Sequence, residues 1–145
     1  MTKSGFQLIN HRLVDVKYHV NKAYKPKTEN ISLDIGYQTL INREKDANKA
    51  LVTFIFTIFK DEKDTSKYPF KIETTHEGEF EWPEDTPDDR VNSLLKINAP
   101  AIMLSYDRSI ISMITTYSGM APLIIPLINF KADPVSSPGE PIDQH

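Results

Sequence analysis

The chain contains no cysteine and only 5 glycines among its 145 residues. Without cysteine it can form no disulfide bond, no thiol nucleophile and no thiolate-bound zinc site, and this composition fits a reducing compartment. It also lacks a glycine-rich phosphate loop, a nucleophile elbow and a paired-carboxylate motif. We therefore expect a protein that is not an enzyme and that needs no cofactor.

Neither charge nor hydropathy is extreme. Lysine and arginine number 17 against 20 aspartates and glutamates, for a net charge of −3. With no basic excess to attract a phosphate backbone, we expect no nucleic-acid partner. No apolar run approaches the roughly 20 residues that a membrane helix needs, and Met1 to Gly5 lacks the apolar core of a signal peptide. We expect a cytoplasmic protein that does not insert into membranes.

The titratable residues suggest no catalytic or metal centre. Asp107 and Arg108 could take part in catalysis, but Asp107 falls near the apolar arc of a predicted helix and Arg108 on its polar stripe. An ion pair at an interface, or charges on the helix surface, explains them better. Zinc is not expected, because no metal-ligand spacing relates the four histidines, His11, His19, His76 and His145.

Alternating apolar and polar residues predict four strands. The run from Leu51 to Phe59 is apolar or threonine on both faces, which is typical of a central strand. His76-Glu77-Gly78 predicts a bulge in the last strand. The predicted strands cover residues 14–20, 31–37, 51–59 and 70–82.

Two helices are predicted after Pro83. Thr86 is the expected N-cap of the first, with Pro87 in its first turn. Asn98-Ala99-Pro100 should end that helix and begin a longer one, because a proline disfavours helical backbone at the residue before it. Four strands followed by a short and a long helix indicate an α+β fold with an antiparallel sheet. We expect one domain over residues 1–130, and a disordered proline-containing tail over residues 131–145.

The long helix is apolar over more than half of its circumference between residues 102 and 117. A helix that lies on a single sheet needs a narrower apolar stripe, so a second apolar neighbour is expected, and in a chain this short it can be another subunit. The residues predicted to form that oligomer interface are Ile102, Tyr106, Ile110, Met113, Ile114 and Tyr117.

Three segments carry a resemblance to a known family. The most specific is Asn98-Ala99-Pro100 followed by Tyr106 and Arg108, with Asn129-Phe130 closing the segment. The other two run from Phe70 to Phe80, and through Asp15-Val16-Lys17-Tyr18 with Leu33-Asp34. On these residues the chain resembles the SecB export chaperones over about residues 6–130.

That resemblance implies a four-stranded antiparallel sheet with a long helix, and a homotetramer built as a dimer of dimers. It also implies an ATP-independent holdase that binds unfolded preproteins in apolar grooves and keeps them competent for export. Tyr24, in the loop after the first strand, is a candidate for the client groove. An ordinary packed tyrosine is the alternative for this position.

The resemblance is incomplete where the family contacts the motor ATPase SecA. Asp15 and Glu73 match two of the acidic contact residues, although ordinary solvated strand residues would look the same. Lys71 stands in place of an apolar residue and His19 in place of an acid, which should weaken binding to a basic partner. The family's C-terminal helix also has no counterpart in residues 131–145.

Three alternatives to an export chaperone therefore stay open. The chain could be a SecB-like chaperone dedicated to one client, such as an antitoxin. It could be an oligomeric protein-interaction adaptor without chaperone activity. It could also bind a small ligand, or act on one, in a pocket between sheet and helix.

Overall fold

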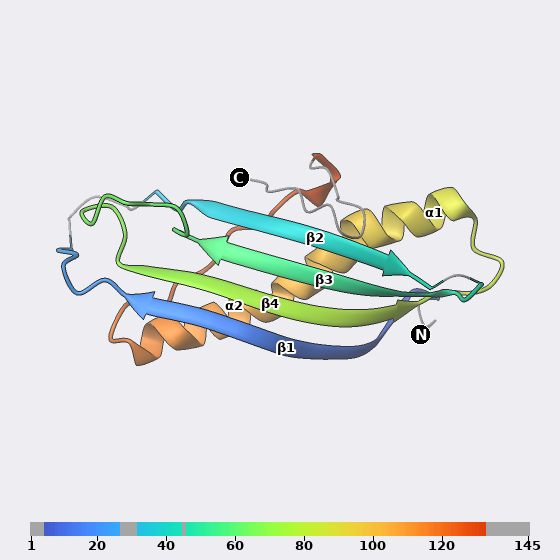
Figure 1. Cartoon of the computed structure of the whole chain (residues 1–145), viewed down its shortest axis with the longest axis horizontal. Helices are drawn as coiled ribbons and strands as arrows, with labels where there is room; N and C mark the ends of the chain where they lie inside the picture. The colour runs from blue at the N-terminus through green and yellow to red at the C-terminus, as the bar shows by residue number, and fades with distance from the viewer. Residues whose placement is uncertain (1–4, 27–31, 45, 133–145) are drawn as a thin grey trace.

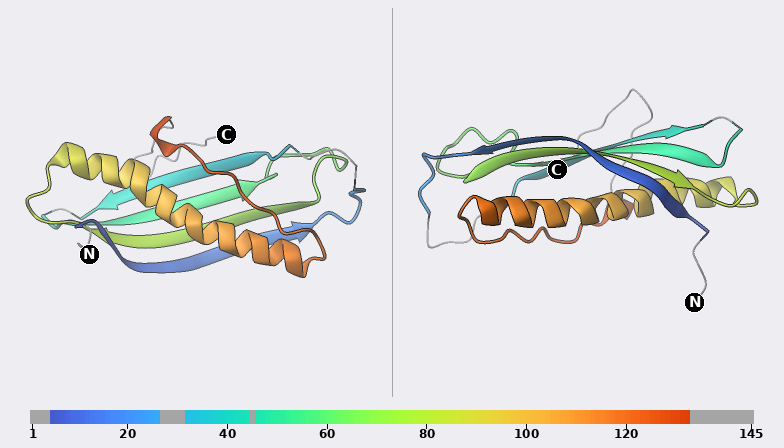
Figure 2. Two further views of the ribbon diagram at one scale, coloured as in Figure 1. Left: turned by 180° about the vertical axis from the view of Figure 1, so that it is seen from behind. Right: turned by 90° about the horizontal axis from the view of Figure 1, so that it is seen from below.

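The protein forms a four-stranded sheet covered on one face by a helical layer (Figures 1 and 2). The computed structural model describes residues 5–26, 32–44 and 46–132. All neighbouring strands are antiparallel, in the order β1-β4-β3-β2, which confirms the predicted fold class and the internal position of β3. The strands are β1 (Gln7–Val20), β2 (Ile35–Arg43), β3 (Lys49–Ile58) and β4 (Phe70–Glu81).

The two faces of the sheet differ because side chains alternate along each strand. In β3 the residues that face the helices are fully or almost fully buried, whereas Leu51, Thr53 and Ile55 on the other face are half-buried. We call these the inner and the outer face. The buried residues of β3 on the inner face are Ala50, Val52, Phe54, Phe56 and Ile58.

The bulge predicted in β4 lies instead in the facing strand. β1 shifts its register between Leu8 and Asn10 and again between Leu13 and Asp15, while β4 continues through Gly78. These two irregularities displace the alternation, which is why the sequence pattern missed the first half of β1. Gly78 is required for a steric reason, because a Cβ atom there would lie 2.9 Å from the sulfur of Met103. The glycine lets the long helix approach the sheet.

The two predicted helices are one continuous helical run, α1 (Asp88–Ser93), a π-helical turn (Leu94–Asn98) and α2 (Ala99–Tyr117). The predicted break before Pro100 is wrong, since Asn98 and Ala99 keep right-handed helical dihedrals. The Ala99 N–H donates to the Leu94 carbonyl, five residues back. This wider turn accommodates a proline that has no N–H and whose ring would crowd a regular α-helix.

The start of α1 also differs slightly from the prediction. The helix begins at Asp88 with Pro87 in the capping position. The Thr86 hydroxyl donates to the Pro83 carbonyl at 2.7 Å. Thr86 therefore stabilises the turn before the helix.

After α2 the chain reverses and runs back beside the helix (Figure 2). Residues 120–130 form this return segment. The Leu123 N–H donates to the Thr115 hydroxyl at 3.1 Å, and the Arg108 Nε donates to the Ile125 carbonyl at 3.1 Å. Both bonds tie the return segment to α2, so helix and return segment together cover the inner face.

The return segment ends in the core. The Phe130 ring lies edge-on to Tyr37 and Phe54, with centroids 5.0 and 5.9 Å away. A short 3-10 turn follows at Phe130–Ala132. Beyond Ala132, the predicted disordered tail falls outside the described residues.

Candidate assembly and partner-binding surfaces

α2 has one side on the sheet and a second apolar side that the single chain leaves uncovered. Met103, Leu104 and Ile111 are buried against the sheet. On the flank toward β1, the exposed fractions are 38% for Tyr106, 52% for Met113 and 86% for Tyr117. The other predicted interface residues are half-buried: Ile102, Ile110 and Ile114. All six side chains are thus at least partly accessible, and their place in an oligomer interface stays a prediction.

The edge strand β1 continues this uncovered apolar surface. The His11 ring stacks on the Tyr106 ring, with centroids 3.7 Å apart and planes 11° from parallel, and so joins β1 to α2. Exposed apolar residues that gather on a surface mark an interaction site more often than scattered ones do. We define the β1–α2 flank by its six exposed apolar residues: Ile9, Leu13, Val14, Tyr106, Met113 and Tyr117.

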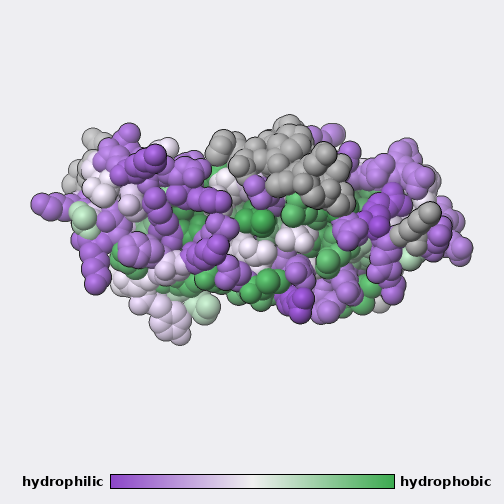
Figure 3. Space-filling model, in the orientation of Figure 1, coloured by the Kyte–Doolittle hydropathy of each residue, from purple (hydrophilic) through white to green (hydrophobic). Residues whose placement is uncertain are grey.

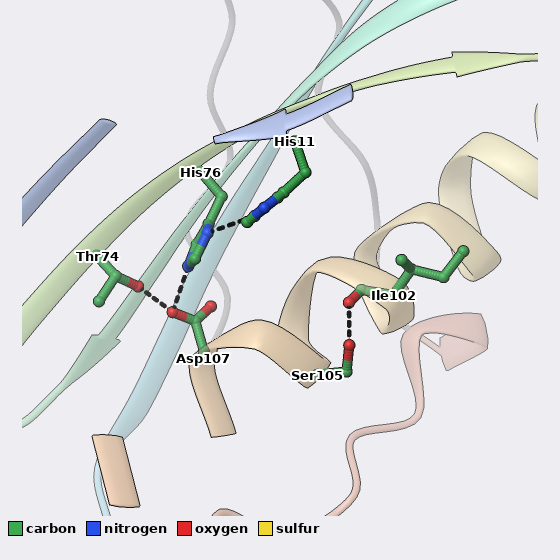
Figure 4. A network of polar contacts seen from close by, with 6 residues as sticks. All are labelled: His11, Thr74, His76, Ile102, Ser105 and Asp107. Carbon is green, nitrogen blue, oxygen red and sulfur yellow. Dashed lines mark hydrogen bonds and ion pairs between the residues drawn. The ribbon is translucent and has the colours of Figure 1, made fainter. Parts of the chain in front are cut away.

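A buried polar network connects β4 with α2 and extends to β1 (Figure 4). The Thr74 hydroxyl donates to Oδ1 of Asp107, and Nε2 of His76 lies 2.7 Å from the same oxygen. Nε2 of His11 lies 2.9 Å from Nδ1 of His76. The network thus runs from β4 and α2 to the uncovered edge strand.

The structure contradicts one of the two settings predicted for Asp107, a charge on the helix surface. Its side chain is fully buried, so it is neither a helix-surface charge nor partnered by its neighbour Arg108. A buried carboxylate is costly unless hydrogen bonds replace its water shell, and Thr74 and His76 supply them. Its second oxygen, Oδ2, is buried with no hydrogen-bond partner among the described residues.

Burial and the neighbouring groups of the network shift the pKa of His11. Burial lowers the pKa of His11 below its usual 6.5, and the neighbouring His76 lowers it further. The Asp107 carboxylate acts in the opposite direction and is the smallest of the three influences. Desolvation therefore favours a neutral His11 imidazole at neutral pH.

The predicted translocase contacts lie together on the outer face. Glu73 of β4 faces Lys17 of β1 across the ladder, and Asp15 lies two residues along β1. Lysine ammonium groups accompany both carboxylates: Lys17 Nζ is 4.0 Å from Asp15, and Lys60 Nζ is 3.4 Å from Glu73. These surface pairs contribute little to stability but offset the negative charge offered to a partner.

The same end of the outer face holds the two residues that depart from the family pattern. His19 and Lys71 face each other across the β1–β4 ladder. The Lys71 ammonium lies 4.8 Å from the centre of the Tyr68 ring, a cation–π contact. With Lys17 and Lys60 they line an open pocket of about 460 Å³. Glu73 also lines this pocket, so three lysines accompany one carboxylate there and positive charge predominates.

The other end of the outer face is acidic. Glu77, Glu79 and Glu81 alternate along β4, and Arg12 of β1 approaches Glu77 at 3.0 Å. Polar and charged residues cover much of this view of the molecule, with apolar patches between them (Figure 3). The outer face thus carries opposite charge at its two ends.

Tyr24 lies in the turn that follows β1. Its side chain is half-buried, and its N–H donates to the Asn21 carbonyl at 3.2 Å. The Asn21 amide in turn donates to the carbonyls of Thr65 and Tyr68, which holds this turn against the loop between β3 and β4. The client-groove assignment of Tyr24 stays a prediction.

Sequence reasoning missed the buried network, although one signal was present. Thr74 and His76 occupy positions of β4 that the alternation assigns to the same buried face as Ile72 and Phe80. Polar residues in the buried phase of a strand call for a partner on the covering element. That partner, Asp107, is 31 residues from His76 in the chain.

The described ranges offer neither a metal-binding cluster nor a membrane-spanning helix. Within them, no cluster of three or more potential ligands could hold a metal ion. Nor does any helix of those ranges have the length and apolar character needed to cross a membrane.

Comparisons with known proteins identify relatives of the whole domain. Residues 12–133 match the sequence model of the family described as "Preprotein translocase subunit SecB". A Methanocaldococcus jannaschii protein, named "Uncharacterized protein MJ0357", is 29% identical over 127 residues, which cover 88% of this chain and 81% of that protein. Among solved structures, the Mycobacterium tuberculosis Rv1957 SecB-like chaperone, bound to a peptide from the HigA1 antitoxin, aligns with a TM-score of 0.65. The alignment covers 85% of this chain and 90% of that chain at 13% identity, so it shows a shared fold.

Proposed function

The chain belongs to the SecB family, and we propose on that basis that it is an ATP-independent holdase chaperone for unfolded or precursor proteins. The family match, which spans residues 12–133, carries the proposal. We place this activity in the cytoplasm and assign no cofactor to it.

Exposed apolar side chains supply the physical basis for holding unfolded chains. Outside the β1–α2 flank, the return segment leaves Ile124 77% and Leu127 84% exposed. Removing apolar client segments from water is favourable, non-directional and roughly proportional to area. Such binding requires neither nucleotide hydrolysis nor a defined client sequence.

Assembly is the second part of the proposal. We infer a homotetramer, built as a dimer of dimers, in which the β1–α2 flank is covered by other copies of the chain. The partial exposure of all the predicted interface residues in the single chain supports this arrangement. A symmetric closed assembly would bury these side chains without leaving an open surface for further association.

The first candidate role is export, in which clients would be delivered to SecA through a contact at Asp15 and Glu73. The lysines beside both carboxylates, together with His19 and Lys71, favour the second candidate, a chaperone dedicated to one client. A dedicated client would not require an acidic docking face for a motor ATPase. The remaining alternatives are an interaction adaptor without chaperone activity, and a protein that binds or acts on a small ligand between sheet and helix.

The test is aggregation of a chemically unfolded preprotein, without ATP, with and without the purified chain. Suppression at a near-stoichiometric ratio is expected from a species of about 66 kDa, the mass of four chains of 16.6 kDa each. A chain that leaves aggregation unchanged would reject the holdase and move the adaptor to first place.

A further inference from the structure

We propose that His11, His76 and Asp107 form a proton-binding site that couples pH to the β1–α2 flank, so that acidification opens the assembly. The inference rests on the proposed function in one respect, the use of this flank between copies of the chain. The three side chains come from β1, β4 and α2, so their hydrogen bonds connect all the elements around the flank.

Hydrogen-bond chemistry limits how many protons the network can hold. Nε2 of His11 and Nδ1 of His76 face each other at 2.9 Å, so one nitrogen must donate and the other must accept. A neutral imidazole has one donor and one acceptor nitrogen, whereas an imidazolium has two donors. The contact therefore survives while at least one ring is neutral, and it fails when both rings are charged.

A second proton would place two cations in a small buried space. The His11 and His76 rings lie with centroids 5.0 Å apart, and among the described residues Asp107 is the one carboxylate bonded to the network. Repulsion between two N–H donors would push His11, the half-buried member, away from fully buried His76. Because His11 stacks on Tyr106 at 3.7 Å, its displacement would disturb an exposed residue of the flank.

Few other charged groups face this site. From β4 the facing group is His76, and from α2 they are Asp107 and the Tyr106 ring. On β1 itself the neighbouring Arg12 pairs with Glu77 on the outer face. After burial, which is the largest influence, His76 and Asp107 are thus the charged groups that shift the pKa of His11.

The direction of the effect follows from His11. Its pKa is lowered below 6.5 by burial and by His76, so the ordered flank takes up this proton less readily than an opened one. The stabilising contribution is complete above pH 6.5 and is lost as the pH falls through the lowered pKa of His11. Assembly should therefore be complete at pH 7.5 and should weaken on acidification.

The experiment measures the solution mass of the full chain between pH 8 and pH 5, for wild type, His11→Gln and His19→Gln. Glutamine keeps a neutral hydrogen-bonding group but takes up no proton, and His19 is the exposed histidine of the same strand. Wild type and His19→Gln should lose mass together as the pH falls, whereas His11→Gln should keep its mass. The rise in the dissociation constant of the assembly between pH 8 and pH 5 should be at least about tenfold smaller in His11→Gln than in wild type. An unchanged wild-type mass at pH 5, or equal losses in wild type and His11→Gln, would overturn the proposal.

A direct titration covers the case in which His11→Gln does not fold. The NMR signal of the His11 ring in the wild-type chain should change over the same pH range in which the mass falls, and a change over a different range would refute the coupling. The aggregation assay at pH 7.5 separates this inference from the proposed function. A chain that suppresses aggregation but keeps its mass at pH 5 rejects only the proton coupling, whereas failure to suppress aggregation counts against the holdase.

Discussion

Asp107 shows how much a single buried side chain can determine. Its Oδ1 binds both Thr74 and His76, so replacing it with alanine leaves two buried polar groups without their acceptor. We expect Asp107→Ala to lower the free energy of unfolding by about 3 kcal/mol. Denaturant unfolding measures the change, with Asp61→Ala as a control in an exposed loop that should shift stability by less than about 0.5 kcal/mol. Equal effects of the two substitutions would mean that the network is not stabilising.

Gly78 is a second residue that the fold requires, in this case for a steric reason. An added Cβ would lie 2.9 Å from Met103 Sδ and 3.0 Å from Cε2 of Phe80. Gly78→Ala should destabilise the fold by about 1–3 kcal/mol, because the crowded side chains must shift. In a Met103→Ala background the same substitution should cost less, and a double-mutant cycle of melting curves measures the difference. An additive cycle would place the strain elsewhere than between sheet and helix.

The return segment is anchored in the core by Phe130, its C-terminal residue. Phe130 is buried between Tyr37 and Phe54, whereas Leu127 of the same segment is 84% exposed. Phe130→Ala should cost about 3 kcal/mol of unfolding free energy, and Leu127→Ala should change it by less than about 0.5 kcal/mol. Denaturant midpoints compare the two. A similar loss from both substitutions would show that the exposed leucine also packs in solution.

Strands were the elements most accessible from the sequence, because alternation is a local property. Central β3 could be placed from its own residues, since both faces of it are apolar or threonine. The first half of β1 escaped because its two register shifts disrupt the alternation. The helical break at Pro100 was misjudged, because a π turn can accommodate a proline and leaves no signature in local propensity.

The candidate surfaces were less accessible, because they depend on which segments meet. The apolar breadth of α2 is readable from its own sequence, and the structure leaves its β1 side uncovered. The bond between His11 and His76 joins residues 65 positions apart, and no periodicity relates them. Asp107 could be assigned to its network only after the strand order had placed β4 beneath α2.

The association of whole molecules is tested at the middle of α2. Ile110 lies half-buried on the flank side of the helix, and its neighbour Ser109 is exposed on the polar stripe. Ile110→Asp should reduce the solution mass, because an unpaired carboxylate buried in an interface costs several kcal/mol. Ser109→Asp adds the same charge to the same helix and should leave the mass unchanged. Light scattering after gel filtration compares them, and an Ile110→Asp variant of wild-type mass would place residue 110 outside any interface.

The strand order has a consequence for how the molecule is made. β1 is synthesised first, yet its pairing partner is β4, and the two strands are connected by the whole of β2 and β3. Ribosomes add about 5–20 residues per second, so β1 waits several seconds for its partner, while β2 and β3 can pair as soon as both have emerged. During that interval the nascent chain exposes an unpaired strand with its apolar side chains. A protein proposed to shelter unfinished chains thus passes through the same vulnerable state during its own translation.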